Sequence, residues 1–256
     1  MKVAMVQMTA STVAIQENEK LIMSYCAAAV AKGAHLICFP EMALIGYSFE
    51  DLSERLLQQK QVIKGLHQFS KETGLSIIIG GIEADEGQYY IAQFVIDKEI
   101  DSYRKIHIGQ KERSFVVSGD TIKVFDCQGI KLGLILCYDG HFPELVTIMA
   151  EKGAQLILNP SASPNKAERR VAMWRKYLIA RAYDNRLWVA ATNLRFKGKG
   201  GGILVVDGDG QEVAASTEDK DDMIIFDYVP GTYSSTSMMK RDFKIDRRQD
   251  IYDKYR

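Results

Sequence analysis

Apolar and polar residues follow two rhythms along this chain, and each rhythm predicts one kind of element. Short apolar runs bounded by Gly, Pro or polar residues indicate strands, whereas longer stretches with an apolar residue every three or four positions indicate amphipathic helices. In the first half we expect, in order, the strand, helix, strand, helical segment (in one or two pieces) and two strands Val3–Met8, Ile15–Lys32, Ala34–Phe39, Asp51–Thr73, Leu75–Gly80 and Tyr89–Ile96. In the second half we expect the same order over Ile130–Leu136, Phe142–Lys152, Gln155–Asn159, Ala167–Asn185, Leu187–Asn193 and Gly202–Val206. Further strands are expected at Ile100–Arg104, Thr121–Cys127, Gln211–Ala215 and Met223–Tyr228.

The two halves also share a short sequence repeat. "KGAHLICFPEMA" begins at Lys32 and "KGAQLILNPSAS" begins at Lys152, 120 residues further on. In each copy Gly follows a predicted helix, where a left-handed residue commonly ends one, and an apolar strand then ends at Pro. The order β-α-β-α-β-β therefore occurs twice, and the chain is predicted to be one unit built from two similar halves.

Several predicted strands, such as "LICF", "SIII" and "GLIL", are apolar at every position. Such strands are typical of sheets that are buried on both faces. Two halves of this kind would pack sheet on sheet with helices outside, which predicts an α/β fold, a four-layer α-β-β-α sandwich with an internal pseudo-repeat. We expect a single domain over residues 1–256, whose charged tail from about 231 to 256 could cross to a partner subunit.

Composition narrows the class of partner. The 256 residues include 46% hydrophobic and 26% charged residues, and Lys+Arg and Asp+Glu both number 33. A formal net charge of zero argues against nucleic acid and against a polybasic membrane anchor, and favours a small-molecule substrate. No apolar run has the length of a membrane span, and "MKVAMVQMTAST" is too short in its apolar part for a signal peptide. We therefore expect a cytoplasmic protein.

Reactive side chains follow the ends of three predicted strands. Glu41 comes after Ala34–Phe39, Lys105 after Ile100–Arg104, and Cys137 after Ile130–Leu136. In open α/β sheets, ligands bind beyond the carboxyl ends of the strands. A carboxylate can take the proton of a thiol, and an ammonium beside it can hold a developing oxyanion, as acyl transfer through a thioester requires.

Each of these residues also has an ordinary structural interpretation. A cysteine at the end of an apolar strand is usually a core residue, and Lys105 alone would be a solvated charge. His107 and His141 are weak candidates, because a histidine near the end of a strand is more often a hydrogen-bonding structural residue. The remaining cysteines are scattered without a CxxC or Cys/His spacing, so neither a disulfide framework nor a zinc site is indicated. A catalytic role for Glu41, Lys105 and Cys137 becomes convincing only when the three are considered together.

Three segments resemble the motifs of the nitrilase superfamily, the carbon–nitrogen hydrolases. "FPEMALIGY" resembles the Glu motif of the family, "YRKIHI" its Lys motif and "GLILCYDGHFPE" its Cys motif, in the family's order. The resemblance implies the α-β-β-α sandwich and hydrolysis of non-peptide C–N bonds without a metal or organic cofactor. It also implies at least a homodimer, since members generally dimerise.

The resemblance assigns roles by position. Glu41 would be the general base, Lys105 the oxyanion stabiliser and Cys137 the nucleophile, exposed by a sharp turn. Glu112, in "KERSFVVSG", best matches a second glutamate that positions the substrate in many members. Tyr47, together with Tyr138 and His141, would line the substrate pocket.

The substrate stays open between several classes. We expect a small primary amide, hydrolysed with release of ammonia. The segment "DGHFPE" resembles a sequence motif of aliphatic amidases and formamidases. It also places His141 where carbamoyl-amino-acid hydrolases tend to carry Arg. "GYSFEDL" resembles a phrase of the glutaminase domain of NAD synthetases, so a stand-alone glutaminase is an alternative. Amides that carry a carboxylate remain an alternative, because that carboxylate could be bound by Arg169, Arg170 or Arg175. Nitrile and N-carbamoyl substrates, or a non-catalytic binding protein that retains the fold, complete the alternatives.

Overall fold

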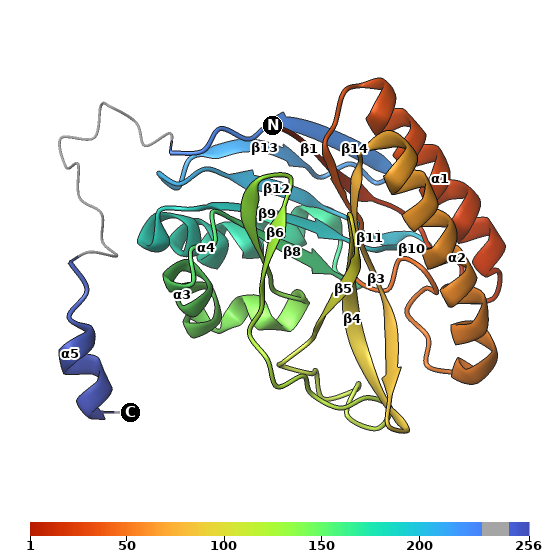
Figure 1. Ribbon diagram of the computed structural model, residues 1–256, viewed down its shortest axis with the longest axis horizontal. Coiled ribbons are helices and arrows are strands. Elements are labelled where there is room, and N and C mark those ends of the chain that lie inside the picture. Colours follow the sequence, from red (N-terminus) through yellow and green to blue (C-terminus); the bar gives the residue numbers. More distant parts are fainter. Residues whose placement is uncertain (232–245, 256) are drawn as a thin grey trace.

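The computed structural model describes residues 1–231 and 246–255. Within these residues two six-stranded sheets form the centre of the molecule (Figure 1). The first sheet has the order β14-β1-β2-β3-β4-β5, with bounds Asp222–Asp227, Lys2–Gln7, Leu36–Cys38, Ser76–Asp85, Gln88–Ile96 and Ile100–Arg104. The second has the order β13-β12-β9-β8-β7-β6, with bounds Glu212–Ser216, Ile203–Val206, Trp188–Asn193, Leu156–Ser161, Ile130–Leu134 and Val124–Cys127. A small hairpin, β10 (Arg195–Phe196) with β11 (Lys199–Gly200), stands beside them.

The strand orders of the two sheets are the same when read from equivalent ends. β1-β2-β3 pair in parallel, and β14, β4 and β5 add antiparallel strands on either side. In the second sheet β7-β8-β9 pair in parallel, and β6, β12 and β13 add antiparallel strands in the corresponding places. The internal repeat predicted from the sequence is therefore a repeat of topology as well.

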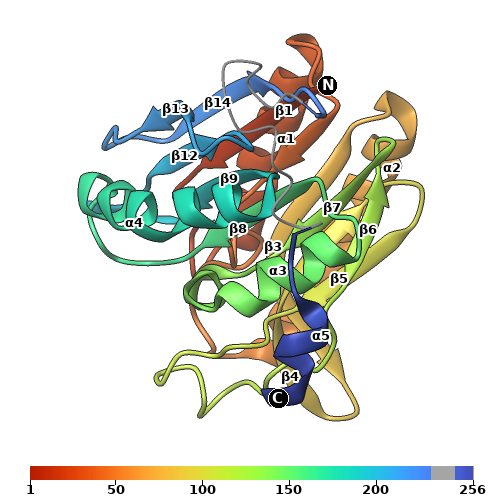
Figure 2. The ribbon, with the colours of Figure 1, turned by 90° about the vertical axis from the view of Figure 1, so that its left-hand side faces the viewer.

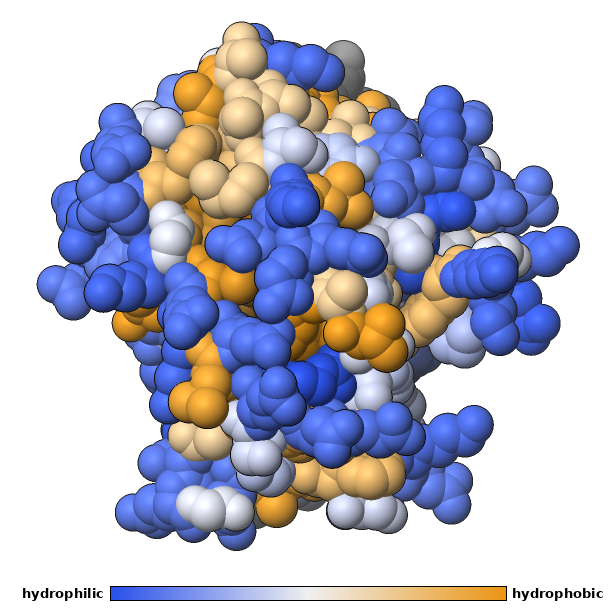
Figure 3. Space-filling view, turned by 90° about the vertical axis from the view of Figure 1, so that its right-hand side faces the viewer, coloured by the Kyte–Doolittle hydropathy of each residue, from blue (hydrophilic) through white to orange (hydrophobic). Residues whose placement is uncertain are grey.

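Helices cover the outer faces of both sheets (Figures 1 and 2). α1 (Ile15–Ala31) and α2 (Leu52–Thr73) lie outside the first sheet, and α3 (Pro143–Glu151) and α4 (Ala167–Asn185) lie outside the second. The face that carries α1 and α2 is mostly hydrophilic, with apolar patches between the polar side chains (Figure 3). The predicted four-layer α-β-β-α sandwich is confirmed.

Most predicted elements have bounds shifted by one or two residues, but β3 runs to Asp85, five residues beyond the predicted Gly80, and β6 starts at Val124, three residues after the predicted Thr121. The segment over residues 51–73 is one continuous helix, α2, which ends at Gly74 with φ +74 and an N–H that donates to the Ser70 carbonyl at 2.8 Å. β7 ends at Leu134, because the chain then leaves the ladder: the side-chain amide of Asn159 donates to the Ile135 carbonyl at 3.0 Å. That departure begins the turn that carries Cys137.

The predicted crossing of the tail to a partner subunit falls largely on residues 232–245 and 256, which lie outside the described residues. Beyond them, α5 (Gln249–Tyr252) and the 3₁₀ turn η2 (Asp253–Tyr255) bury no residue. Among the described residues, none of the helices has the length and apolar content needed to cross a lipid bilayer.

Candidate active site

Glu41 lies on a buried turn that leaves the carboxyl end of β2. Its side chain is fully buried, and Met42 beside it has φ +63. The turn fits against β3 only because residue 80 is glycine: a Cβ there would lie 2.4 Å from the Met42 nitrogen and 2.7 Å from the Glu41 Cα. The Gly80 carbonyl accepts the Leu44 N–H at 2.9 Å and fixes the turn. The backbone thus directs a carboxylate inward, where a core residue would be expected.

Lys105 lies between two buried carboxylates. Its Nζ donates to Glu41 Oε1 at 2.8 Å and to both oxygens of Glu112 at 2.8 and 3.0 Å. Lys105, Glu41 and Glu112 are exposed by only 1%, 0% and 4%. Burial alone would lower the pKa of Lys105, but the charges of Glu41, Cys137 and Glu112 outweigh it and raise this pKa well above its ordinary value. The lysine is therefore a permanent ammonium.

Glu112 is held in place by donors from its own loop and from a second loop. It accepts the Gly109 N–H at 2.5 Å and the Tyr47 hydroxyl at 2.5 Å, in addition to Lys105. Burial by itself raises the pKa of Glu112, but Lys105, Tyr47 and Gly109 together hold it below the usual value. Glu112 is thus an ionised carboxylate, and the hydroxyl of Tyr47, a residue predicted to line the substrate pocket, is bonded to it.

The loop that carries Tyr47 has its own supports. The guanidinium of Arg55 on α2 donates to the carbonyls of Ile45, Ser48 and Glu50. Phe49 in this loop stacks on Phe115 in the Glu112 loop, with ring centroids 5.0 Å apart and an interplanar angle of 5°. The two loops that approach Lys105 are therefore tied to each other.

Cys137 has a backbone conformation that few non-glycine residues adopt. Its φ is +45, and it opens the 3₁₀ turn η1 (Cys137–His141) directly after the extended Leu136. A left-handed residue with a Cβ costs on the order of 1–2 kcal/mol, so the surrounding structure must impose it. Among the four free cysteines Cys137 alone is partly exposed, while Cys26, Cys38 and Cys127 are buried, as predicted.

The buried carboxylate of Asp139 imposes this turn. One oxygen accepts the Leu136 N–H and the Tyr103 hydroxyl, both at 2.9 Å. The other accepts the backbone N–H of His107 at 2.8 Å and lies 2.9 Å from its Nδ1. Sequence reasoning missed Asp139 and Tyr103, because an Asp in a polar turn usually faces water. The position of an Asp two residues after the candidate nucleophile was the sequence feature that could have identified Asp139.

The three predicted residues share one electrostatic environment. Burial raises the pKa of the Cys137 thiol and Glu41 raises it further, while Lys105, Arg170 and the Ala162 N–H oppose the rise without cancelling it. Burial also raises the pKa of Glu41, against Lys105. The resting nucleophile is therefore a thiol beside a carboxylate, and Glu41 Oε2, buried and without a hydrogen-bond partner among the described residues, is the free acceptor.

Comparisons with known proteins identify the family of this chain. Residues 2–237 match the family model of the carbon–nitrogen hydrolases. The chain belongs to the carbon–nitrogen hydrolase family. It is similar to a nitrilase from Pyrococcus abyssi, with 34% identity over 62% of this chain and 64% of that protein. It is also similar to a glutamine-dependent NAD(+) synthetase from Thermotoga maritima, with 32% identity over 85% of this chain and 39% of that protein. The chain thus matches less than two thirds of the length of these two relatives.

One solved structure of the same family aligns with this chain over the full length of both proteins. The amidase from Nesterenkonia sp. AN1 superimposes with a TM-score of 0.84, 26% identity and 100% coverage of each chain. The structure in question is a variant that carries acrylamide added to its active-site cysteine. The nitrilase superfamily identified from three sequence motifs is therefore confirmed.

The remaining predicted residues of this carbon–nitrogen hydrolase, Tyr138 and His141, lie within η1. Tyr138 is 45% exposed, and its ring centroid lies 5.6 Å from that of His141. His141 in turn lies 4.6 Å from Tyr177 on α4. Burial and the charges of Arg170 and Arg181 lower the pKa of His141, so its imidazole is neutral. This environment favours the interpretation of His141 as a neutral polar wall.

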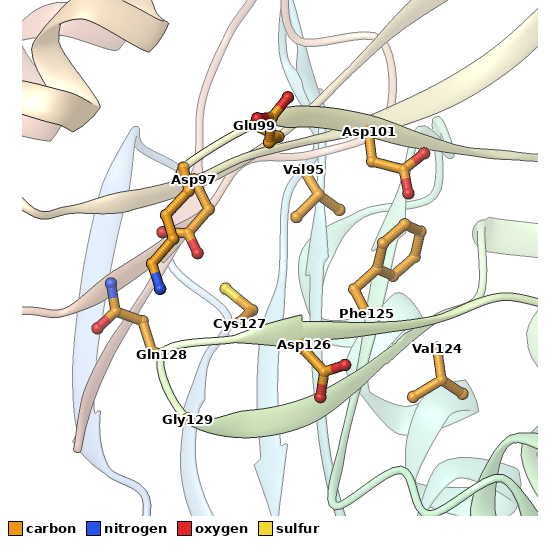
Figure 4. A pocket seen from close by; sticks show the side chains of 11 residues that line it. Val95, Asp97, Glu99, Asp101, Val124, Phe125, Asp126, Cys127, Gln128 and Gly129 are labelled. Atoms are coloured by element: carbon orange, nitrogen blue, oxygen red, sulfur yellow. The ribbon is translucent and has the colours of Figure 1, made fainter.

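A cavity lies near the start of β5 and β7, whereas Lys105 and Cys137 follow the ends of these two strands (Figure 4). It has a volume of about 820 Å³ and is lined mainly by the β4–β5 turn and the β6–β7 hairpin. Its one thiol, Cys127, is buried, and burial raises its pKa to about 11. No residue of the Glu41, Lys105 and Cys137 group lines it, so the candidate chemistry belongs to the other end of the sheets.

Proposed function

We propose that this chain hydrolyses a small primary amide through a thioester on Cys137 and releases ammonia. The observation that carries the proposal is the buried group in which Glu41, with one free carboxylate oxygen, shares Lys105 with Glu112 beside a partly exposed thiol. Within the part of the chain that the structure describes, neither glutamate forms an ion pair with a surface residue. A buried lysine between two carboxylates, near the strained turn that carries Cys137, has no evident structural purpose.

The first half of the reaction forms the thioester. Glu41 Oε2 takes the thiol proton as the sulfur attacks the amide carbon, which suits a carboxylate whose pKa is raised toward that of its partner. The carbonyl oxygen becomes an oxyanion beside the ammonium of Lys105 and the N–H of Tyr138. Glu41 then returns the proton to the amide nitrogen, the C–N bond breaks, and ammonia leaves.

The second half releases the acid. Glu41 takes a proton from water, the hydroxide attacks the thioester carbon, the C–S bond breaks, and Glu41 returns the proton to the sulfur to restore the Cys137 thiol. Lys105 stabilises this second oxyanion in the same way. Glu112 orients Lys105 throughout: its two oxygens at 2.8 and 3.0 Å can share one N–H, so that one of the three ammonium protons stays available for the oxyanion.

The relatives support an amide over the alternatives only in part. The solved relative is an amidase, while the synthetase relative depends on glutamine, which is itself a primary amide. The nitrilase relative keeps a nitrile open. A binding protein without activity would have no need to retain Glu41, Lys105 and Cys137 in one electrostatic environment.

The test is ammonia release from matched butyramide, butyronitrile, glutamine and an N-carbamoyl amino acid. We expect a higher kcat/KM with butyramide than with butyronitrile or the N-carbamoyl amino acid, and an acyl adduct on Cys137 by mass spectrometry when a slow substrate is used. Cys137→Ala should abolish release, while Cys127→Ala, which changes a buried cysteine outside the site, should retain it. A carbamoyl substrate that wins by more than about tenfold, or roughly 1.4 kcal/mol of transition-state binding, would refute the amide preference.

A further inference from the structure

The helix α4 carries a buried cation that the reaction above does not use. Arg170 is 5% exposed, and its Nε makes no hydrogen bond to any described residue. Within residues 1–231 and 246–255, no carboxylate forms an ion pair with it; its neighbour along the helix is the indole of Trp174, 5.6 Å from the guanidinium carbon. Buried charges in proteins are normally paired, because an unpaired one loses its hydration without compensation.

Arg170 lies beside the nucleophile. α4 begins at Ala167, a few residues after β8 ends at Ser161, which places its first turns at the edge of the sheet where Cys137 opens η1. Two turns along the same face, Tyr177 packs against η1 so closely that a Cβ on Gly140 would lie 3.1 Å from its ring. In keeping with this placement, the Arg170 charge opposes the rise that burial causes in the pKa of Cys137.

A second polar group on this face is also unsatisfied. The Tyr177 hydroxyl is buried beside the Arg170 guanidinium, which can donate to its oxygen, and the hydroxyl proton has no acceptor among the described residues. Burial raises the pKa of Tyr177 to about 12, and the nearby Arg170 acts against that rise, so the hydroxyl stays a neutral donor next to the cation. A guanidinium without a counterion and a hydroxyl whose proton lacks an acceptor are the groups that a carboxylate would satisfy.

The other arginines of this helix do not share these properties. Arg175 is bound by Glu212 through two hydrogen bonds at 2.7 and 2.9 Å on the surface. Arg169 is exposed. Arg181 is partly exposed, and although its Nε also lacks a hydrogen-bond partner among the described residues, its guanidinium donates to the His141 carbonyl at 3.5 Å. Arg170 is therefore the member of the set that is both buried and without a counterion near the thiol.

We propose that Arg170, assisted by the Tyr177 hydroxyl, binds a carboxylate at the far end of the substrate, so that the preferred substrates are monoamides of short dicarboxylic acids. This inference rests on the proposed amide hydrolysis and names its substrate class. The carboxylate supplies the missing counterion, and its pairing with Arg170 fixes the distance from the anchor to the amide carbon that Cys137 attacks.

The experiment compares kcat/KM for glutaramate with that for hexanamide, a neutral amide of similar length. Wild type should prefer glutaramate, and Arg170→Met should lower kcat/KM for glutaramate on the order of 30-fold or more, mainly through KM, while changing hexanamide less than about threefold. Arg170→Lys should fall between, because an ammonium pairs without the guanidinium fork. Tyr177→Phe should lower the glutaramate to hexanamide ratio by a smaller factor. Arg175→Met is the matched control and should change neither substrate.

Binding separates failure of this inference from failure of the proposed reaction. Glutarate should raise the melting temperature of the wild-type protein and of Arg175→Met, but not of Arg170→Met. If neither amide releases ammonia yet glutarate stabilises only proteins that retain Arg170, the reaction is wrong and the anion site stands. Equal losses on both amides in Arg170→Met, a wild type without preference for glutaramate, or a change of oligomeric state in Arg170→Met would overturn the inference. Should Arg170→Met fail to fold, Arg170→Lys and Tyr177→Phe still decide through the substrate ratio.

Discussion

Replacing Asp139 with asparagine removes the charge that builds the nucleophile turn. Each carboxylate oxygen meets one backbone donor that cannot reverse, the N–H of Leu136 on one side and that of His107 on the other. The Tyr103 hydroxyl and the His107 ring can adapt, but whichever way the new amide is turned, its NH₂ faces one of those backbone donors. A lost hydrogen bond to a charged group is worth about 1.5–3 kcal/mol, and the buried donor left unsatisfied adds about 1–3 kcal/mol.

We therefore expect Asp139→Asn to lower the free energy of unfolding by about 3 kcal/mol, a large share of the roughly 5–15 kcal/mol of a typical domain. Because Cys137 is then no longer held at φ +45, kcat should fall about tenfold or more. Urea unfolding and ammonia release measure the two effects. Asp126→Asn is the control: its carboxylate is 84% exposed beside Lys131, and its loss should cost no more than about 0.5 kcal/mol. An Asp139→Asn protein within 1 kcal/mol of wild type with unchanged kcat would refute this account.

Further changes probe the reaction and the assembly. Iodoacetamide should label Cys137 well before the three buried cysteines, and Cys137→Ser should be inactive but folded; early labelling elsewhere would count against this. Glu41→Gln and Lys105→Arg should each lower kcat on the order of 10²-fold, and a Lys105→Arg enzyme as fast as wild type would make that lysine a structural charge. Since protonated Glu41 cannot accept the thiol proton and its pKa is raised, kcat/KM should fall with decreasing pH at a midpoint above the ordinary glutamate value of about 4.3; a midpoint at or below it would contradict the role. Light scattering should detect at least a homodimer that truncation at Pro230 weakens, and a monomer at micromolar concentration would refute this.

Several features of this protein follow from the sequence alone. Strand and helix positions depend on spacings of two and 3.6 residues, which are local, so the elements and the internal repeat could be predicted. Glu41, Lys105 and Cys137 could be selected as candidates too, because each lies just after a predicted strand, where ligand sites occur in α/β folds, and because the three segments resemble family motifs. The ends of several strands, above all β3, β6 and β7, were left imprecise, and the β10–β11 hairpin was not predicted.

The contacts that give these residues their chemistry depend on tertiary structure. Lys105 meets Glu41 across 64 positions of sequence, and Asp139 meets Tyr103 across 36. No local pattern specifies such pairs, because they form only when separate strands are brought to one edge of the sandwich. An arginine on an amphipathic helix likewise looks the same in sequence whether it reaches water or the core. That Arg170 is buried without a counterion, and that Cys137 is held in a left-handed turn, was decided by packing alone.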